Sequence, residues 1–387
     1  MKKLALVLVT LSLVLGACDN KPAKPVEPVV VLPDVIKIGT IQPMSGPIAI
    51  YGQQTVNAVK IAIEEINAAG GILGKPVELI VEDDENKPEK TTNAFTKMVS
   101  QDKVVGIVGA LTSNATLSIA PLAQSEGVPL ISPTATNDKV TLEGDFIFRA
   151  CYTDSFQGSV VGQFAVQNLK AKKAAVFYDV ANDYSTGLYN TFKSKFEALN
   201  GVGSVSAEAY SAGDKDFSAQ ITKLKTLNPD VIFIPDYYST VTLIATQFRS
   251  QGITVPLLGA DGWDSITAEG TDDVIGSYYS NHYSPEADDA EVKKFVASYV
   301  AKHGEVPNAL AALGYDATYI LAKAIENAKS VEPKAIRDAM AKVSGKFVTG
   351  NISFDANRNP IKSAVMVEII KGADGKLATK YAGTVNP

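Results

Sequence analysis

The sequence contains few of the residues from which metal and acid–base sites are most often built. Its 387 residues include two histidines, two cysteines and one tryptophan. His282 and His303 belong to no cluster with metal-ligand spacing, so we expect no metal site. The carboxylate run "EDDEN" at 82–86 lacks the glycine turn and the distal Glu of a calcium loop, and it is typical of a solvated strand end.

Motifs for nucleotide binding and for nucleophilic catalysis are also missing. "GIVGALTSN" follows an expected strand but does not have the form G-x-G-x-x-G, and the chain contains neither G-x-x-x-x-G-K-[ST] nor G-x-S-x-G. A net charge of -6 argues against a nucleic-acid partner, which would require a basic face. We therefore expect no cofactor and no enzymatic activity.

The first residues resemble an export signal. Lys2 and Lys3 precede the apolar run "LALVLVTLSLVLG", which is too short to span a membrane comfortably. "LGAC" at 15–18 resembles the bacterial lipobox, so we expect a lipoprotein signal peptide at 1–17, a lipid on Cys18 and a proline-containing tether at 18–34. The alternative is an ordinary secretory peptide with an incidental cysteine. With Cys18 lipidated, Cys151 has no partner for an intrachain disulfide.

Strand-like and helix-like segments alternate along the chain in two successive series. They lie at 35–41, 56–69, 76–83, 89–100, 104–110, 115–125 and 128–132, and again at 173–179, 186–199, 204–210, 217–227, 230–236, 241–250 and 255–261. This alternation predicts two parallel sheets, each covered by helices on both faces. Helices expected at 291–302, 309–328 and 333–343, with short strands at 351–354 and 364–370, indicate that the chain returns to the first sheet.

Polar residues follow several of the expected strands, where α/β sheets bind their ligands. "LTSN" at 111–114 and "SPTATND" at 132–138 follow neighbouring strands and present Ser113, Thr134 and Thr136. Hydroxyls and free helix amides there can bind a carboxylate, although capping of the next helix is the alternative. Asp261 in "GADGW" can bind an ammonium group or cap the next segment. Both sites together would suit a zwitterion.

Four aromatic residues stand near the expected cleft. Tyr51, Tyr184, Tyr237 and Trp263 follow strand ends or begin helices in both series. Their rings can stack on a ligand or close over it, and ordinary packing is the alternative for each.

These motifs, in this order, resemble those of the leucine/isoleucine/valine-binding proteins of bacterial ABC importers. The resemblance covers residues 35–387 and rests on "IKIGTIQPMSGPIAIYGQ", "GALTSNAT", "GVPLISPTATND", "FRACYTDSFQG", "DYSTGL", "DYYS" and "GADGW". It implies the α/β type I periplasmic-binding-protein fold, with two doubly wound parallel-sheet lobes joined by a hinge of three crossings near 151–156, 281–286 and 349–362. Lobe 1 would contain 35–152 and 285–362, and lobe 2 would contain 153–284 and 363–387.

The resemblance also implies roles for the polar residues. Ser113 and Thr136 would hold the α-carboxylate of the ligand, while the Thr134 carbonyl and the Asp261 carboxylate would accept from its α-ammonium. Tyr51, Tyr184 and Tyr237 would line the cleft.

The chain departs from the family pattern at several places, which include Asn114 and Ala115 in place of more serine-like residues. Asp261 replaces a typical Glu, Thr112 stands where relatives often have a disulfide, and Trp263 is expected to narrow the side-chain pocket.

The expected function is extracytoplasmic capture of a small α-amino acid between two closing lobes. The expected ligand is a branched-chain amino acid, Leu, Ile or Val. The protein would act as a monomer, held by its lipid on the outer side of the cytoplasmic membrane or in the periplasm. It would deliver the amino acid to an ABC permease with a cytoplasmic ATPase. Alternatives are an aromatic amino acid, a short amide or a carboxylate as ligand, or a sensing role. An exported α/β enzyme would need a base in the cleft, and both histidines are expected outside the strand-end loops.

Overall fold

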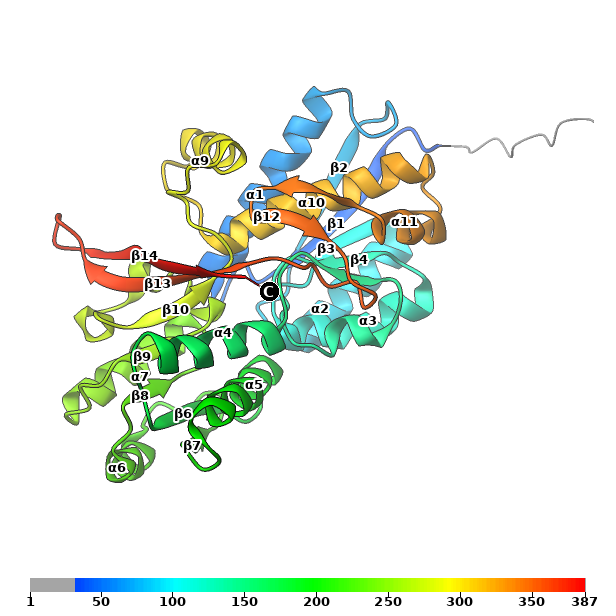
Figure 1. Ribbon diagram of the computed structural model, residues 1–387. Helices are drawn as coiled ribbons and strands as arrows, with labels where there is room; N and C mark the ends of the chain where they lie inside the picture. Colours follow the sequence, from blue (N-terminus) through cyan, green and yellow to red (C-terminus); the bar gives the residue numbers. More distant parts are fainter. Residues whose placement is uncertain (1–31, 387) are drawn as a thin grey trace, which may run out of the picture. The chain divides into compact units, whose positions relative to one another are not determined.

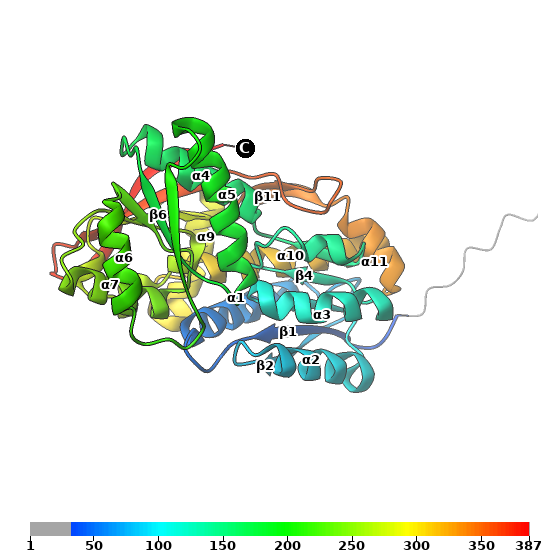
Figure 2. The ribbon, with the colours of Figure 1, turned by 90° about the horizontal axis from the view of Figure 1, so that it is seen from below.

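The computed structural model describes residues 32–386. The expected signal peptide, Cys18 and nearly all of the expected tether lie outside the described residues. The described chain contains two sheets with helices packed against them, and Figures 1 and 2 show the two groups of elements.

The first sheet has the strand order β2-β1-β3-β4-β5, and its neighbouring strands are parallel. Its elements are β1 (Ile36–Gln42), α1 (Ala49–Ala68), β2 (Val77–Asp83), α2 (Pro88–Lys97) with a π-helical turn at Met98–Asp102, β3 (Gly106–Gly109), α3 (Ser113–Glu126), β4 (Leu130–Ser132) and β5 (Ile147–Arg149). A proline at the start of α2 and a left-handed Gly127 after α3 mark helix ends in the usual way. We call this sheet and the helices packed on it lobe 1.

A later part of the chain also packs on lobe 1. It contains α9 (Ala290–His303), α10 (Ala309–Ala328), α11 (Pro333–Met340) and a hairpin of β11 (Ser344–Phe347) and β12 (Gly350–Ser353). The gold α10 in Figure 1 packs along α1 and also contacts β3 and β4. Asn308 caps α10 by accepting from the Ala311 amide at 2.7 Å.

Within the described residues, the second sheet has the order β14-β13-β10-β9-β8-β6-β7. Its elements are α4 (Asp154–Gln167), β6 (Ala174–Asp179), α5 (Asp183–Asn200), β7 (Val205–Tyr210), α6 (Ser218–Leu227), β8 (Val231–Phe233), α7 (Tyr238–Ser250), β9 (Leu257–Gly259), α8 (Ile266–Glu269), β10 (Tyr278–Asn281), β13 (Ala364–Lys371) and β14 (Leu377–Val385). β13 and β14 are antiparallel and extend one edge of a sheet that is otherwise parallel. We call this group lobe 2.

Across residues 32–386 the chain passes between the lobes three times: from β5 to α4, from β10 to α9, and from β12 to β13. Cys151 lies fully buried at the first of these passages, and burial raises the pKa of its thiol to about 12. A thiol in this setting is an inert packing residue.

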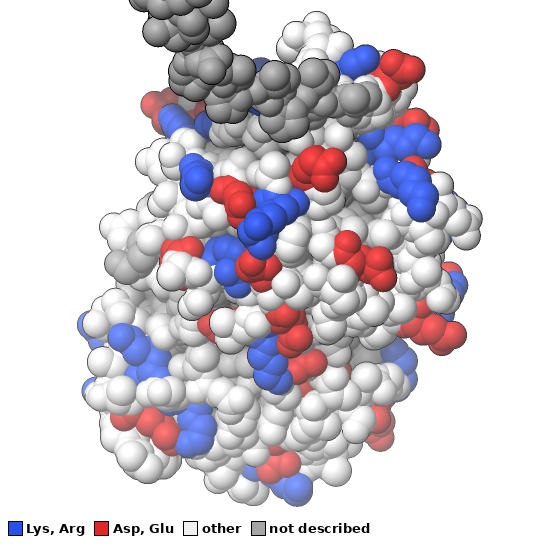
Figure 3. Space-filling model, turned by 90° about the vertical axis from the view of Figure 1, so that its right-hand side faces the viewer, with Lys and Arg blue, Asp and Glu red and all other residues white. Residues whose placement is uncertain are grey.

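One face of the molecule is mixed in charge (Figure 3). The face in Figure 3 carries Lys and Arg interspersed with Asp and Glu, without a large patch of one sign. None of the helices described here is both long and apolar enough to cross a bilayer.

Candidate ligand-binding site

A small cavity lies between the lobes, at the carboxyl ends of strands from both sheets. Its lining residues surround about 270 Å³ of space between atoms, and this volume includes open solvent. Its wall consists of Tyr51, Leu111, Thr112, Ser113, Thr134 and Leu310 from lobe 1 and of Tyr184, Tyr237, Asp261 and Gly262 from lobe 2. The cavity is small, and residues of both lobes line it.

The lobe 1 wall is built from the start of α3 and from the loop after β4. Ser113 is the first residue of α3, and the N-cap Thr112 accepts from the Ala115 amide at 3.4 Å. The first amides of a helix have no acceptor within the helix and lie at the positive end of its dipole. The Asn137 amide donates to Ser113 Oγ at 3.2 Å and ties the two loops together. This wall can bind a carboxylate through neutral donors.

The two threonines of the second loop have different surroundings. Thr134 lines the cavity, but its hydroxyl donates to the Leu111 carbonyl at 2.6 Å. Thr136 is fully buried and is not part of the cavity wall. Burial raises the pKa of the neighbouring Asp154 carboxyl well above its ordinary value, and the Thr136 hydroxyl counteracts part of that increase. The structure thus brings Ser113 and Thr134 to the cavity, whereas Thr136 is fully buried and is not among the residues that line it.

Asp261 provides the acceptor on the lobe 2 wall, in a 3-10 turn directly after β9. Its Oδ1 accepts from the Tyr184 hydroxyl at 2.9 Å and from Gln157 Nε2 at 3.0 Å, and its Oδ2 lies 2.9 Å from His282 Nε2. A carboxylate offers about four lone-pair sites. Three of them are used by the protein, which leaves one without a partner among the described residues.

Gly262 joins the aromatic residues of the two lobes. Its amide donates to Tyr184 Oη at 2.8 Å, and its carbonyl accepts from the Tyr51 hydroxyl across the cavity. A Cβ at this position would lie 2.7 Å from Tyr184 Oη, so only glycine fits. The Tyr184 and Tyr237 rings stack with centroids 5.3 Å apart, and Tyr51 meets Tyr237 edge-on at 6.3 Å. The three predicted tyrosines therefore converge on one cavity.

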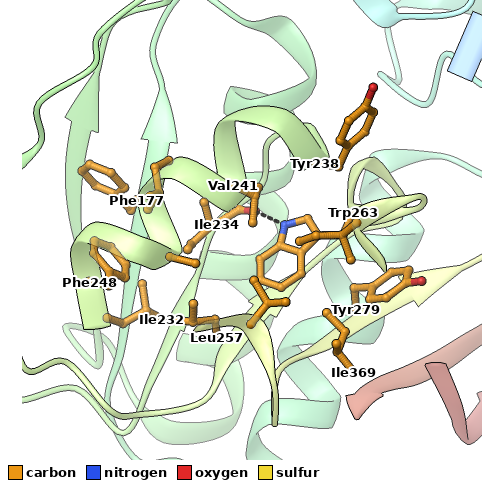
Figure 4. Packing of buried hydrophobic residues seen from close by; sticks show 14 of the residues in the cluster. Phe177, Ile232, Ile234, Tyr238, Val241, Phe248, Leu257, Trp263, Tyr279 and Ile369 are labelled. Carbon is orange, nitrogen blue, oxygen red and sulfur yellow. Dashed lines mark hydrogen bonds between the residues drawn. The ribbon is translucent and has the colours of Figure 1, made fainter. Parts of the chain in front are cut away.

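Trp263 does not belong to this group, which corrects the expectation that it narrows the ligand pocket. Trp263 is not among the residues that line the cavity, and its side chain is fully buried in a hydrophobic cluster formed mostly by lobe 2. Its Nε1 donates to the Ile234 carbonyl at 2.8 Å, and its ring lies among aliphatic residues and Tyr279 (Figure 4). Trp263 thus stabilises the turn that carries Asp261 without contacting the cavity.

Two residues at the site escaped the sequence analysis. The expectation that both histidines lie outside the strand-end loops is wrong for His282, because it directly follows β10. Gln157 lies on α4, a helix that the apolar pattern does not show. The tyrosine-rich "SYYSN" before His282 is the signal that could have indicated the strand.

The carboxylates of "EDDEN" are hydrogen-bonded or ion-paired within the protein. Asp84 is fully buried and accepts from Thr91 Oγ1 at 2.9 Å, so the expectation of a solvated strand end is wrong at this residue. Glu82 and Glu85 pair with lysines. No group of three potential metal ligands occurs among residues 32–386.

Comparison with known proteins gives consistent matches over nearly the whole described chain. A family described as periplasmic binding protein matches residues 35–376. A leucine-, isoleucine-, valine-, threonine- and alanine-binding protein of Pseudomonas aeruginosa is 31% identical over 325 residues, which are 83% of this chain and 86% of the relative.

Two crystal structures are similar over their full length. A leucine-binding protein from Thermotoga maritima is 37% identical with a TM-score of 0.86, covering 91% of this chain and 99% of that chain. A branched-chain amino acid transporter substrate-binding protein from Streptococcus pneumoniae, in complex with isoleucine, is 35% identical with a TM-score of 0.82, covering 91% of this chain and 100% of that chain.

The fold and the cavity between its lobes define a two-lobed α/β ligand-binding protein. The chain belongs to the periplasmic binding protein family and, within it, to the Leu/Ile/Val-binding proteins, the solute-binding components of branched-chain amino acid ABC transporters. Membership of this family makes it a transporter component and not an enzyme.

Proposed function

We propose that this protein captures a branched-chain α-amino acid in the cavity between its lobes. One observation carries the proposal: the Asp261 carboxylate and the amino end of α3 line the same small cavity from opposite lobes. An α-amino acid carries a carboxylate and an ammonium group on one carbon, and it matches this pair of charges. The relatives named for leucine, isoleucine and valine support the same ligand class.

The ligand carboxylate would dock on lobe 1, against the first amides of α3 and the Ser113 hydroxyl. Its ammonium would donate to the free lone pair of Asp261 and to the Thr134 carbonyl. Leu111 and Leu310 give the cavity an apolar side suited to an aliphatic side chain. Because the ligand contacts both lobes, it stabilises the state in which they are together, and this state is the signal for a permease.

We further propose export and anchoring through the N-terminus, with the signal at 1–17 removed and a lipid on Cys18. The support is the lipobox-like "LGAC" after an apolar run. Two or three acyl chains would hold the protein stably at the membrane. There, as a monomer, it would deliver its amino acid to an ABC permease with a cytoplasmic ATPase. Mass spectrometry of the mature N-terminus tests the anchor.

A thermal-unfolding screen of the purified protein against the amino acids tests the ligand class. A ligand at 100 times its Kd adds about 2.7 kcal/mol of stability. We expect Leu, Ile or Val to give the largest increase in melting temperature. If no α-amino acid changes the melting temperature, the proposed function is wrong.

A further inference from the structure

His282 is a buried residue with a single side-chain hydrogen bond. Its Nε2 lies 2.9 Å from Asp261 Oδ2, and its ring stacks on Tyr152 with centroids 3.8 Å apart. Its side chain is 0% exposed, and its Nδ1 has no hydrogen-bond partner in the described part of the chain. The contact with Asp261 therefore determines which ring nitrogen carries the hydrogen.

A neutral imidazole has one N–H donor and one acceptor nitrogen. An ionised Asp261 can only accept, so the hydrogen resides on Nε2 of His282. Protonation would add a second N–H at the buried Nδ1, where no acceptor is available. Burial lowers the pKa of His282, and the nearby Asp261 carboxylate opposes this change. The neutral ring with hydrogen on Nε2 is the form that suits these surroundings.

We propose that neutral His282 is a positioning residue for the ligand ammonium. Its Nε2 donates a hydrogen bond that orients the Asp261 carboxylate, and because the ring is neutral, the negative charge of Asp261 stays uncompensated. The inference rests on the proposed function, because it requires an ammonium group at Asp261. A protonated His282 would cancel the charge of the carboxylate and repel the ligand. Binding should therefore weaken as the pH falls through the pKa of His282, about tenfold for each pH unit below it.

Other ionisable groups surround the pair and define the pH range for a test. The positive charge of Lys362, in the third crossing, lowers the pKa of His282, and burial lowers the pKa of Lys362 itself to about 8. Burial raises the pKa values of Cys151 and Tyr152, which stay protonated at neutral pH. Asp154 is coupled to the site through Gln157, and burial raises the pKa of its carboxyl well above the ordinary value. Between pH 5.0 and 7.5 the buried carboxyls of Asp236, Asp264 and Asp316 also change charge, because burial raises their pKa values to about 7, 6 and 6. The difference between wild type and a variant without the imidazole therefore isolates His282.

Calorimetric titration with leucine over this pH range, on wild type and three variants, separates the contribution of His282 from that of the other ionisable groups. His282→Gln retains an N–H at similar reach and does not titrate, so its Kd at pH 7.5 should stay within about threefold of wild type and rise less on acidification. His282→Phe keeps the stacking on Tyr152 but lacks the donor, so its Kd should rise about tenfold or more, as for loss of a bond to a charged group. The control His303→Gln should follow wild type.

A measurement on the wild-type protein keeps the test valid if a variant misfolds. The chain has two histidines, so their ring resonances can be assigned by NMR with His303→Gln. Leucine should lower the pKa of His282 by more than one unit, because a cation arrives nearby, and should leave His303 unchanged. An unchanged pKa of His282 on ligand binding, or a His282→Gln pH profile equal to that of wild type, overturns this role but not ligand capture. Absence of amino-acid binding by wild type at pH 7.5 overturns both.

Discussion

The Tyr51 hydroxyl of lobe 1 donates a hydrogen bond to the Gly262 carbonyl of lobe 2. Further bonds cross between the lobes where α3 meets the start of α5 (Figure 2): Asn114 donates to the Ala181 carbonyl at 3.2 Å and accepts from the Asp183 amide at 2.9 Å. These bonds require the lobes to be in contact. The protein's own residues therefore favour the closed arrangement, and a ligand adds to contacts that already exist.

Tyr51→Phe removes the bond to Gly262 and leaves the aromatic ring in place. One neutral hydrogen bond contributes about 0.5–1.5 kcal/mol, so the Kd for leucine should rise about two- to tenfold by calorimetry. Tyr381→Phe is the matched control, because Tyr381 is 53% exposed. Equal Kd values for Tyr51→Phe and wild type would show that the bond does not contribute to closure.

Asn114→Ala removes both bonds that this residue makes across the lobes. The ligand-free protein should then open more often, and small-angle scattering should show a larger radius of gyration that leucine reduces. Asn357→Ala, at an exposed position, should scatter like wild type. The prediction is wrong if Asn114→Ala and wild type have the same ligand-free radius.

Asp261→Asn tests the ammonium acceptor with little change in shape. The variant loses the charge, and charge-assisted bonds contribute about 1.5–3 kcal/mol each, so the Kd for leucine should rise by one to two orders of magnitude. Asp288→Asn, whose side chain is 95% exposed, serves as the control. A Kd unchanged by Asp261→Asn would refute the assignment.

Asp236 should make stability depend on pH. Burial raises the pKa of its carboxyl from 3.8 to about 7, and Tyr210 donates to it. Since the folded state binds this proton more tightly than the unfolded state, the contribution of Asp236 to stability is present below about pH 4 and is lost as the pH rises to about 7. Asp236→Asn should flatten the decline in the free energy of unfolding between pH 5 and 7, by up to about 1.4 kcal/mol per pH unit.

Urea unfolding at several pH values measures this slope, again with Asp288→Asn as the control. Asp264 and Asp316, with pKa values raised by burial to about 6, should keep part of the slope in the variant. If the free energy of unfolding declines with pH equally in Asp236→Asn and wild type, the Asp236 carboxyl does not cause the pH dependence of stability.

Much of the fold is predictable from the sequence because its apolar patterns are long. The expected helix at 309–328 coincides with α10, where a sustained apolar stripe follows the capping Asn308. α4 escapes prediction because Gly158 and Gly162 interrupt its pattern. In the structure these glycines let α4 approach α5 closely, and a Cβ on Gly158 would lie 2.0 Å from Thr191 Oγ1. A close contact between two helices leaves no pattern in the local sequence of either helix, so it cannot be predicted from that sequence.

The site, too, is predictable only where its residues follow local sequence motifs. Tyr51, Ser113, Thr134, Tyr184, Tyr237 and Asp261 follow recognisable motifs, and the structure brings them to one cavity; that they bind a ligand stays a prediction. The direction of Trp263 depends on a 3-10 turn, and the contact between Asp261 and His282 joins two strand ends. Neither can be inferred from spacing along the chain.

The most direct test compares leucine with 4-methylpentanoate, which has the same carbon skeleton without the amino group, by calorimetry on the wild-type protein at pH 7.5. A cavity that pairs Asp261 with an ammonium group should bind leucine and should bind the analogue at least 100-fold more weakly. Equal affinity for the two compounds, or no binding of leucine, isoleucine or valine, would contradict capture of a branched-chain α-amino acid.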